Sequence, residues 1–361
     1  MNRPQHGGNL NWAAEIAGCP VSALTDFSAS INPLGTPKSA IAAIVNNASQ
    51  LTAYPDPNYP QLRSHLARHH QLDPEFILPG NGSAELLTWA GRELAQQEFT
   101  YLITPAFSDY VRALDAFGGK ILFCPLDLGK GEQPFAPTMP IPQSPHPQSG
   151  LLLNNPHNPT GKLWTINEIL PYLKQFELVV IDEAFMDFLT PDLEQSLIPM
   201  VAEYPNLVIL RSLTKFYSLP GLRIGYAIAH PERLQRWQKW RDPWSVNTLA
   251  AAATIAAIQD KEFQQQTWNW LSSARSRLFE QLQSIPQLQP FESAANYLLV
   301  KTEISATRLQ EKLLTDYQIV IRDCISFPEL GDRYFRIAVR LPAQNDRLTQ
   351  AIAAIVKSGS F

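Results

Sequence analysis

Cysteine is scarce in this chain, and the way its cysteines are spaced excludes several classes of protein. Only three occur among 361 residues, Cys19, Cys124 and Cys324, and they lie far apart. An odd number of widely spaced cysteines fits a reducing compartment and gives no basis for a disulfide framework. Neither a CxxC nor an HExxH spacing occurs, so the sequence offers little support for a metal site. We therefore expect a cytoplasmic protein without a bound metal.

Long apolar runs and a strong net charge are missing as well. No stretch approaches the roughly 20 apolar residues of a membrane-spanning helix. Residues 1–18 lack the apolar core of a signal peptide. The formal net charge is only −4, so we expect no broad surface for a nucleic acid or a membrane.

The length and the change of pattern along the chain predict two lobes. A chain of 361 residues is longer than one ordinary domain. Short apolar runs dominate up to about residue 235, and long helical stretches follow. We expect a large domain at 40–235 and a small domain made of 1–39 and 236–361.

The middle of the chain alternates short apolar runs with amphipathic stretches. The runs are rich in Val, Ile and Leu on both faces, which favours a mostly parallel sheet covered by helices on both sides. The strand–helix alternation predicts an α/β fold. The expected strands are 100–105, 120–126, 150–156, 178–184, 207–213 and 223–229, and the expected helices are 83–95, 107–118 and 165–176.

The C-terminal part predicts a smaller α+β lobe. We expect long helices over 230–260 and 263–285, followed by strands that alternate with helices. The expected strands are 296–302, 319–324 and 333–340, with a helix at 305–316 and a last helix at the C-terminus.

Polar clusters follow several expected strands, where doubly wound sheets bind their ligands. The stretch GNGSAELL (80–87) places Ser83 and Ala84 at the start of a helix, whose free N–H groups can bind an anion. A plain glycine turn capped by Ser83 would look the same. Asn158 is held extended by the following proline and can point its amide at a ligand, although a simple Asn-Pro turn is the alternative.

Asp182 ends an apolar strand, where a carboxylate is costly without a cationic partner. A protonated pyridine nitrogen would be such a partner. A helix-capping or salt-bridged aspartate is the alternative.

The stretch ILRSLTKFYSLPGLRIGYAI (209–228) carries Lys215 in a hydroxyl-rich turn and Arg223 eight residues later. Burial and a neighbouring cation would lower the pKa of Lys215 and give the neutral amine that imine formation requires. Arg223 and Ser212 could bind a phosphate dianion, since guanidinium groups match phosphate geometry. The four clusters in this order argue against a solvated surface lysine.

The motifs NNPHNPTG, IDEAF and SLTKFYSLPGLRIGY resemble, over nearly the whole chain, the signature of the class I/II, fold-type I pyridoxal-phosphate-dependent aminotransferases. The resemblance implies pyridoxal 5′-phosphate as cofactor, with Lys215 as the imine-forming lysine, Asp182 on the ring nitrogen and Asn158 on the ring O3′. It further implies a homodimer. The remaining implied cofactor contacts are Ser83, Ala84, Ser212 and Arg223 at the phosphate, Phe107 on the ring face, and Tyr54 from the neighbouring subunit.

Phe185 departs from the pattern of many relatives, which have a tyrosine there with its hydroxyl on O3′. Loss of that hydrogen bond should raise the proton affinity of the imine and alter reactivity. It does not exclude transamination.

The stretches HGGNL (6–10), DFSASINPLGTP (26–37) and PAFSDY (105–110) resemble the threonine-phosphate decarboxylases of cobalamin biosynthesis, cousins of the histidinol-phosphate aminotransferases. This resemblance implies decarboxylation of O-phospho-L-threonine to (R)-1-amino-2-propanol phosphate. The alternative is a histidinol-phosphate aminotransferase or another class I/II aminotransferase with a phosphorylated substrate. Which arginine would take phosphate and which carboxylate stays open. The implied substrate-binding residues are His6, Gly7, Gly8, Asn32, Asn158, Arg322 and Arg336.

A third reading is a regulator that joins an aminotransferase-like domain to a DNA-binding winged helix. HGGNL begins at residue 6 with no helix-turn-helix before it, and a basic DNA face is missing. We therefore expect a small phosphorylated substrate and no nucleic-acid or membrane partner.

Overall fold

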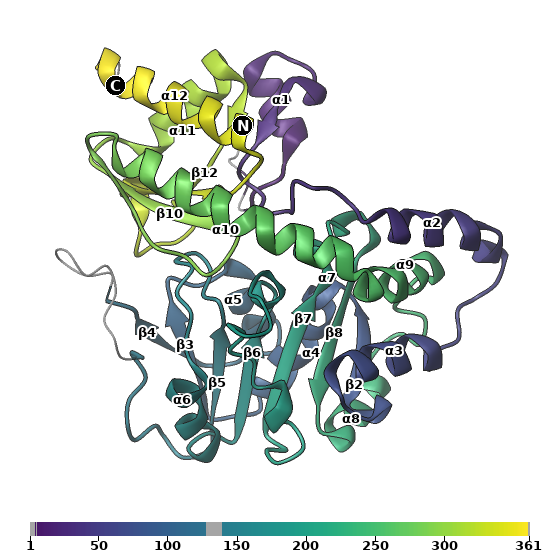
Figure 1. Cartoon of the computed structure of the whole chain (residues 1–361). Helices are drawn as coiled ribbons and strands as arrows, with labels where there is room; N and C mark the ends of the chain where they lie inside the picture. The colour runs from purple at the N-terminus through teal and green to yellow at the C-terminus, as the bar shows by residue number, and fades with distance from the viewer. Residues whose placement is uncertain (1–3, 5, 128–138, 360–361) are drawn as a thin grey trace.

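The computed structural model describes residues 4, 6–127 and 139–359, which form two lobes joined by a long helix (Figure 1). The large lobe is built on a seven-stranded sheet, and the small lobe on a four-stranded sheet. Among the described residues, no helix combines the length and the apolar character needed to cross a membrane.

The large sheet has the order β2-β8-β7-β6-β5-β3-β4. Strand β8 runs antiparallel to both of its neighbours, β2 and β7, and the other neighbouring pairs are parallel, so the expected α/β fold with a mostly parallel sheet is confirmed. All six expected strands form. Their bounds are β3 Phe99–Thr104, β4 Ile121–Pro125, β5 Ser149–Asn154, β6 Leu178–Asp182, β7 Leu207–Ser212 and β8 Ile224–Ala229.

Strand β2 (Ile77–Asn81) is not among the expected strands, and it contains Pro79 and Gly80, which are unfavourable in strands. The structure accommodates the proline at the edge of the sheet, where β2 has only β8 as a neighbour.

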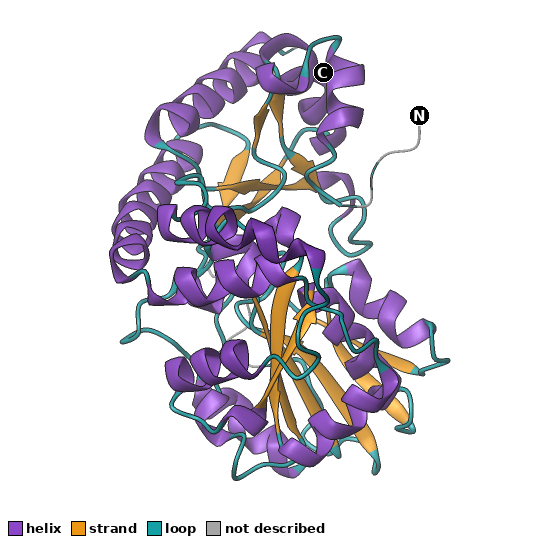
Figure 2. Cartoon of the chain, turned by 90° about the vertical axis from the view of Figure 1, so that its right-hand side faces the viewer, coloured by secondary structure: helices purple, strands orange, loops and turns teal. Residues whose placement is uncertain are grey.

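Helices cover both faces of the large sheet, as Figure 2 shows in side view. One face carries α4 (Gly82–Leu94), α5 (Ser108–Asp115) and α8 (Pro231–Trp240), whose apolar side chains form one cluster with the sheet. The other face belongs to a larger cluster with α3 (Pro60–His70) and α9 (Thr248–Gln259). Every residue of β5, β6 and β7 is buried, as expected for strands covered on both sides.

Two expected helices differ from those observed. The stretch 230–260 divides into α8 and α9 because Pro243 interrupts it. Pro171 ends α6 (Ile166–Ile169), and a 3₁₀ helix η4 (Leu170–Lys174) follows. Helix α8 packs on β2 and β8, and α9 packs on β8 and on α2 (Lys38–Asn47), so contacts with the large lobe continue beyond residue 235.

The small lobe contains an antiparallel sheet with the order β12-β13-β10-β9. A short parallel pair, β1 with β11, ties the N-terminal part of the chain to it. Helix α10 (Lys261–Gln283) runs from beside α9 into this lobe (Figure 1). The other bounds are β1 Thr25–Asp26, β9 Leu288–Pro290, β10 Tyr297–Thr302, β11 Ile319–Val320, β12 Arg322–Asp323, β13 Tyr334–Ala338, α1 Leu10–Ala17, α11 Ala306–Tyr317 and α12 Pro342–Ser358.

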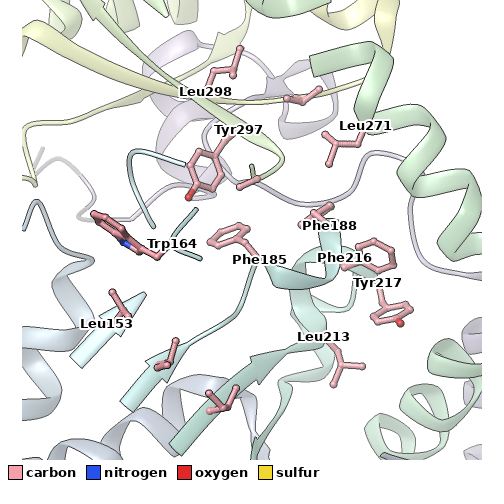
Figure 3. Close-up of a cluster of buried hydrophobic side chains, with 14 of the residues drawn as sticks. Leu153, Trp164, Phe185, Phe188, Leu213, Phe216, Tyr217, Leu271, Tyr297 and Leu298 are labelled. Atoms are coloured by element: carbon pink, nitrogen blue, oxygen red, sulfur yellow. The ribbon is translucent and has the colours of Figure 1, made fainter. Parts of the chain in front are cut away.

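The larger hydrophobic cluster continues from the large sheet into the small lobe. Figure 3 shows part of it, with Phe185 facing the ring of Tyr297 on β10 and Phe188 beside Phe216. The two lobes are therefore joined by shared apolar packing around the carboxyl ends of β5, β6 and β7.

Candidate active site

A cavity of about 220 Å³ lies where these strand ends meet the small lobe. Carboxyl ends of parallel strands are the usual place for ligands in such folds. The cavity brings together side chains that are far apart in the sequence. The sequence-predicted residues that line it are His6, Gly7, Ser83, Ala84, Phe107, Asn158, Asp182, Ser212, Lys215, Arg223, Arg322 and Arg336.

Lys215 lies on the short helix α7 (Leu213–Phe216), directly after β7. Burial lowers the pKa of its amine to about 8, and the charges of Arg336 and Arg223 act in the same direction. Asp182 acts in the opposite direction. With a pKa of about 8, roughly a tenth of the amine is neutral at pH 7, far more than for a lysine of ordinary pKa, and the neutral amine is the form that attacks an aldehyde.

Asp182 ends β6 and is only 8% exposed. Its Oδ2 accepts a hydrogen bond from the Tyr110 hydroxyl at 2.8 Å, and its Oδ1 accepts one from the Ala184 N–H at 3.0 Å. Burial raises the pKa of this carboxyl, while these two hydrogen bonds oppose the shift. Among the described residues, none of the ion pairs includes Asp182. A protonated ring nitrogen would supply the cation that this carboxylate lacks.

The N-terminus of α4 offers donors that could hold an anion. Ser83 and Ala84 start this helix beside Arg223, and the hydroxyls of Ser212 and Thr214 lie 2.8 Å apart on the same cavity wall. Backbone N–H groups, two hydroxyls and a guanidinium group are together a suitable set of donors for a phosphate.

Two glycines allow this close approach. A Cβ at Gly82 would lie 2.5 Å from Arg223 Nη2, and a Cβ at Gly225 would lie 2.6 Å from Ser83 N. The first turn of α4, strand β8 and the arginine can therefore pack together only while these positions lack side chains.

The side-chain amide of Asn158 is oriented by Arg336, whose Nη1 donates to Asn158 Oδ1. The backbone of Asn158 is fixed separately, because its N–H donates to Asn154 Oδ1 at 2.6 Å. The contact with Arg336 leaves the Nδ2 group of Asn158 as the donor toward the cavity. This donor fits an acceptor such as a ring O3′.

Phe185 offers no second donor for that position. Its ring packs against Tyr297 with centroids 5.0 Å apart, and the Tyr297 hydroxyl donates to the His157 carbonyl at 2.9 Å. The apolar residues that line the cavity include Phe107, Ala184 and Phe185.

Three sequence-predicted residues lie outside this cavity. Tyr54 is 80% exposed and lies against the ring of Trp244. Gly8 lines an adjoining hollow, where its N–H donates to Ser28 Oγ at 2.9 Å. Asn32 Nδ2 donates to Phe216 O and Thr267 Oγ1, both at 2.9 Å, so its side chain faces the interior and holds the chain beside Lys215.

Sequence reasoning missed several lining residues, among them Ser28, Ser30, Tyr110, Asn154 and Phe327. Tyr110 carries a detectable signal, because it lies three residues after Phe107 and therefore on the same side of α5. Ser28 and Phe327 carry none, since only the docking of the two lobes brings them to the cavity.

A lysine of lowered pKa, a buried carboxylate that lacks a cation and an anion site at a helix N-terminus together define the site of a fold-type I pyridoxal 5′-phosphate enzyme. The chain belongs to the aminotransferase class I and II family, whose model matches residues 22–352. Pyridoxal 5′-phosphate is the cofactor of this family, and the residues of the cavity fit it.

Curated relatives and solved structures resemble the chain over nearly its whole length. Threonine-phosphate decarboxylase of Salmonella typhimurium is 39% identical, over 97% of this chain and 96% of the relative. The adenosylcobalamin biosynthesis bifunctional protein CobDQ of Leptospira interrogans is 32% identical, over 98% of this chain and 41% of that protein.

Among solved structures, histidinol-phosphate aminotransferase from Clostridium acetobutylicum has a TM-score of 0.82 at 28% identity, covering 92% of this chain and 99% of that one. L-threonine-O-3-phosphate decarboxylase from Porphyromonas gingivalis has a TM-score of 0.80 at 25% identity, with the same coverage of 92% and 99%.

Proposed function

We propose that this enzyme decarboxylates O-phospho-L-threonine to (R)-1-amino-2-propanol phosphate, in the pathway to cobalamin. The likeness to threonine-phosphate decarboxylases over nearly the whole chain supports this reaction. The likeness to CobDQ supports the pathway.

The observation that carries the proposal is a pair of opposed arginines in the cavity. Arg322 on β12 and Arg336 on β13 are direct cross-strand partners, and each is only 8% exposed. Like charges in such positions repel each other and are costly to bury. Burial lowers the pKa of Arg322 to about 10, with the charge of Arg336 adding to the shift. This arrangement suits a substrate with two anionic groups, as O-phospho-L-threonine has.

The two arginines differ in their surroundings. Arg336 donates to Asn158 and, after burial, is the first cause of the lowered pKa of Lys215. Arg322 is the first charge that lowers the pKa of His6. We therefore propose that Arg336 binds the carboxylate beside the reacting carbon and that Arg322, with His6, binds the phosphate.

Bound pyridoxal phosphate supplies the electron sink for the bond that breaks at the α-carbon. Three residues of this chain would assist that step. Asp182 would hold the ring nitrogen protonated, and Arg336 would orient the carboxylate that leaves as CO₂. Lys215 would then give a proton to the α-carbon.

A histidinol-phosphate aminotransferase is the second candidate, because a solved structure of that activity resembles this chain as closely as the decarboxylase does. Histidinol phosphate has no carboxylate, so the carboxylate of glutamate, the second substrate, would use the second arginine.

The deciding experiment is a product assay with purified protein, added cofactor and O-phospho-L-threonine. We expect CO₂ and aminopropanol phosphate in equal amounts, with no keto acid, and no product from unphosphorylated L-threonine. Lys215→Ala is the inactive control. Glutamate formed from histidinol phosphate and 2-oxoglutarate, without CO₂ from phosphothreonine, would overturn the proposal in favour of the aminotransferase.

We also propose a cytoplasmic homodimer. The free state of the three cysteines, Cys19, Cys124 and Cys324, supports a reducing compartment such as the cytoplasm.

An exposed apolar surface supports the homodimer. Large apolar side chains are exposed on and around α2, beside the region that carries Tyr54, and such patches mark interfaces between proteins. They are Ile41, Val45, Leu51, Tyr54 and Trp244.

A further inference from the structure

A network of four charged side chains, centred on the buried Arg211, lies beside the ends of β6 and β7. Arg211 is 1% exposed on its side chain and forms ion pairs with three carboxylates. Its Nε lies 3.0 Å from Glu183 Oε2 and its Nη1 lies 2.5 Å from Asp187 Oδ1, while Nη2 pairs with Glu194. The Glu183 side chain is fully buried and also accepts a hydrogen bond from Ser196 Oγ at 2.7 Å.

Two members of this network are adjacent in sequence to cofactor-site residues. Glu183 follows Asp182 at the end of β6, and Arg211 precedes Ser212 at the end of β7. Since successive side chains of a strand point to opposite faces, the cofactor-facing pair and the ion pair lie on opposite sides of the same two strand ends. One peptide unit therefore separates each member of the ion pair from a residue that lines the cavity.

The same network reaches the segment around Lys215. The carbonyl of Asp187 accepts a hydrogen bond from Trp268 Nε1 of α10 at 2.9 Å. The neighbouring Phe188 packs on Phe216, the residue after Lys215, with ring centroids 5.2 Å apart (Figure 3).

Stability is a weak explanation for these charges. Replacing a buried ion network by apolar residues of similar volume is often neutral or stabilising, because the desolvation of the charges is costly. Here three carboxylates share one guanidinium group, and burial raises the pKa of Glu183 to about 7 against the opposing effect of Arg211. What the network does supply is a fixed geometry, since a guanidinium fork holds several carboxylates at defined angles.

We propose that Glu183 and Arg211 are positioning residues, whose buried ion pair sets the spacing between the Asp182 carboxylate and the Ser212 hydroxyl that hold the cofactor. The proposal rests on the cofactor site described above and is independent of which substrate the enzyme uses.

The test compares Glu183→Gln with the matched control Glu194→Gln. Both changes remove one carboxylate charge from Arg211 and keep the shape of the side chain. Glu194, however, is 34% exposed and is not adjacent to a cofactor-site residue. The measurements are the dissociation constant of pyridoxal phosphate from absorbance titration, kcat and KM for the active substrate, and the unfolding midpoint of the cofactor-free protein.

We expect Glu183→Gln to raise the cofactor dissociation constant about tenfold and to lower kcat by about the same factor, with KM within twofold of wild type. Glu194→Gln should leave the cofactor dissociation constant, kcat and KM within twofold of wild type. Arg211→Lys keeps the charge but loses the planar fork, and it should repeat the pattern of Glu183→Gln.

Wild-type cofactor binding and kcat in Glu183→Gln would overturn the proposal. So would equal losses in Glu183→Gln and Glu194→Gln, or failure of both Glu183→Gln and Arg211→Lys to fold, since the network would then serve only the scaffold. An inactive assay with O-phospho-L-threonine would count against the proposed reaction, but the cofactor titration would still decide the role of the network.

Discussion

At the scale of single residues, the chemistry of the site depends on the protonation state of Lys215. Burial and two neighbouring arginines lower its pKa to about 8 from the ordinary value of 10.5. The neutral fraction of an amine rises with pH through its pKa, so the lowered value makes Lys215 reactive at a lower pH than a surface lysine. The rate at which cofactor-free protein forms its imine with added pyridoxal phosphate should rise from pH 6.5, reach half of its maximum near pH 8 and level off above about 9. Following the imine absorbance in stopped-flow mixing measures this, and a midpoint at or above pH 10 would show that the amine is not perturbed.

Asp182 leads to a prediction in which stability and activity separate. Burial raises the pKa of its carboxyl, which means that ionising Asp182 costs more free energy in the folded protein than in the unfolded chain. Asp182→Asn removes that cost, so the cofactor-free protein should unfold at the same temperature as wild type or higher. Turnover should fall by about a hundredfold or more, because the ring nitrogen loses its charged partner. Calorimetry and steady-state kinetics on the same sample measure both effects, and a variant that turns over like wild type would remove Asp182 from this role.

The residues that could be predicted are those whose function depends on local sequence. Lys215, Asp182 and Asn158 each follow a buried strand in a short motif, and the structure brings them to one cavity. Ser28 and Phe327 reach the cavity through the docking of the two lobes, which no local pattern reports, whereas the spacing from Phe107 could have indicated Tyr110. Asn32 shows that a distinctive motif can mislead. The motif predicts a substrate-binding residue, but the side-chain amide of Asn32 donates to Phe216 and Thr267 in the interior.

At the scale of helices and strands, apolar runs predicted the strands that are covered on both faces, because burial on both sides demands continuous apolar sequence. The edge strand β2 could not be found this way, since an edge tolerates Pro79 and Gly80. The break between α8 and α9 follows from Pro243, which cannot continue a helix.

The close contact between Gly225 on β8 and the first turn of α4 leads to a prediction about cofactor affinity. Gly225→Ala would place a Cβ 2.6 Å from Ser83 N and 2.7 Å from the Arg211 carbonyl oxygen, so the helix terminus must move. We expect cofactor affinity to fall about tenfold or more and the free energy of unfolding to fall by roughly 1–3 kcal/mol. Gly221→Ala is the control, because no atom lies within 4 Å of its added Cβ. Cofactor titration and denaturant unfolding of both variants measure the difference, and equal behaviour of the two would mean that the close approach is not needed.

At the scale of the whole molecule, the active cavity exists because two lobes meet. Lys215 and Asp182 come from the large sheet, whereas Arg322 and Arg336 come from the small one. The sequence predicted both lobes, but their relative placement depends on packing along α10 and on the shared cluster around Phe185 and Tyr297. No pattern along the chain encodes that placement directly.

The exposed apolar surface around α2 leads to the last prediction, which concerns assembly. Val45 on α2 is 67% exposed and lies in the same patch as Leu51 and Tyr54, whereas Phe123 is 56% exposed on β4 at the far edge of the large sheet. If a second copy of the chain covers the α2 patch, Val45→Asp places a charge in the interface, where burial without a partner is costly. We expect sedimentation velocity to find a dimer for wild type and for Phe123→Asp and a monomer for Val45→Asp.

Because Tyr54 is expected to reach the cofactor phosphate of the neighbouring subunit, Val45→Asp should also bind pyridoxal phosphate more weakly, whereas Phe123→Asp should not. A wild-type monomer that binds the cofactor and turns over fully would contradict both the dimer and the role of Tyr54.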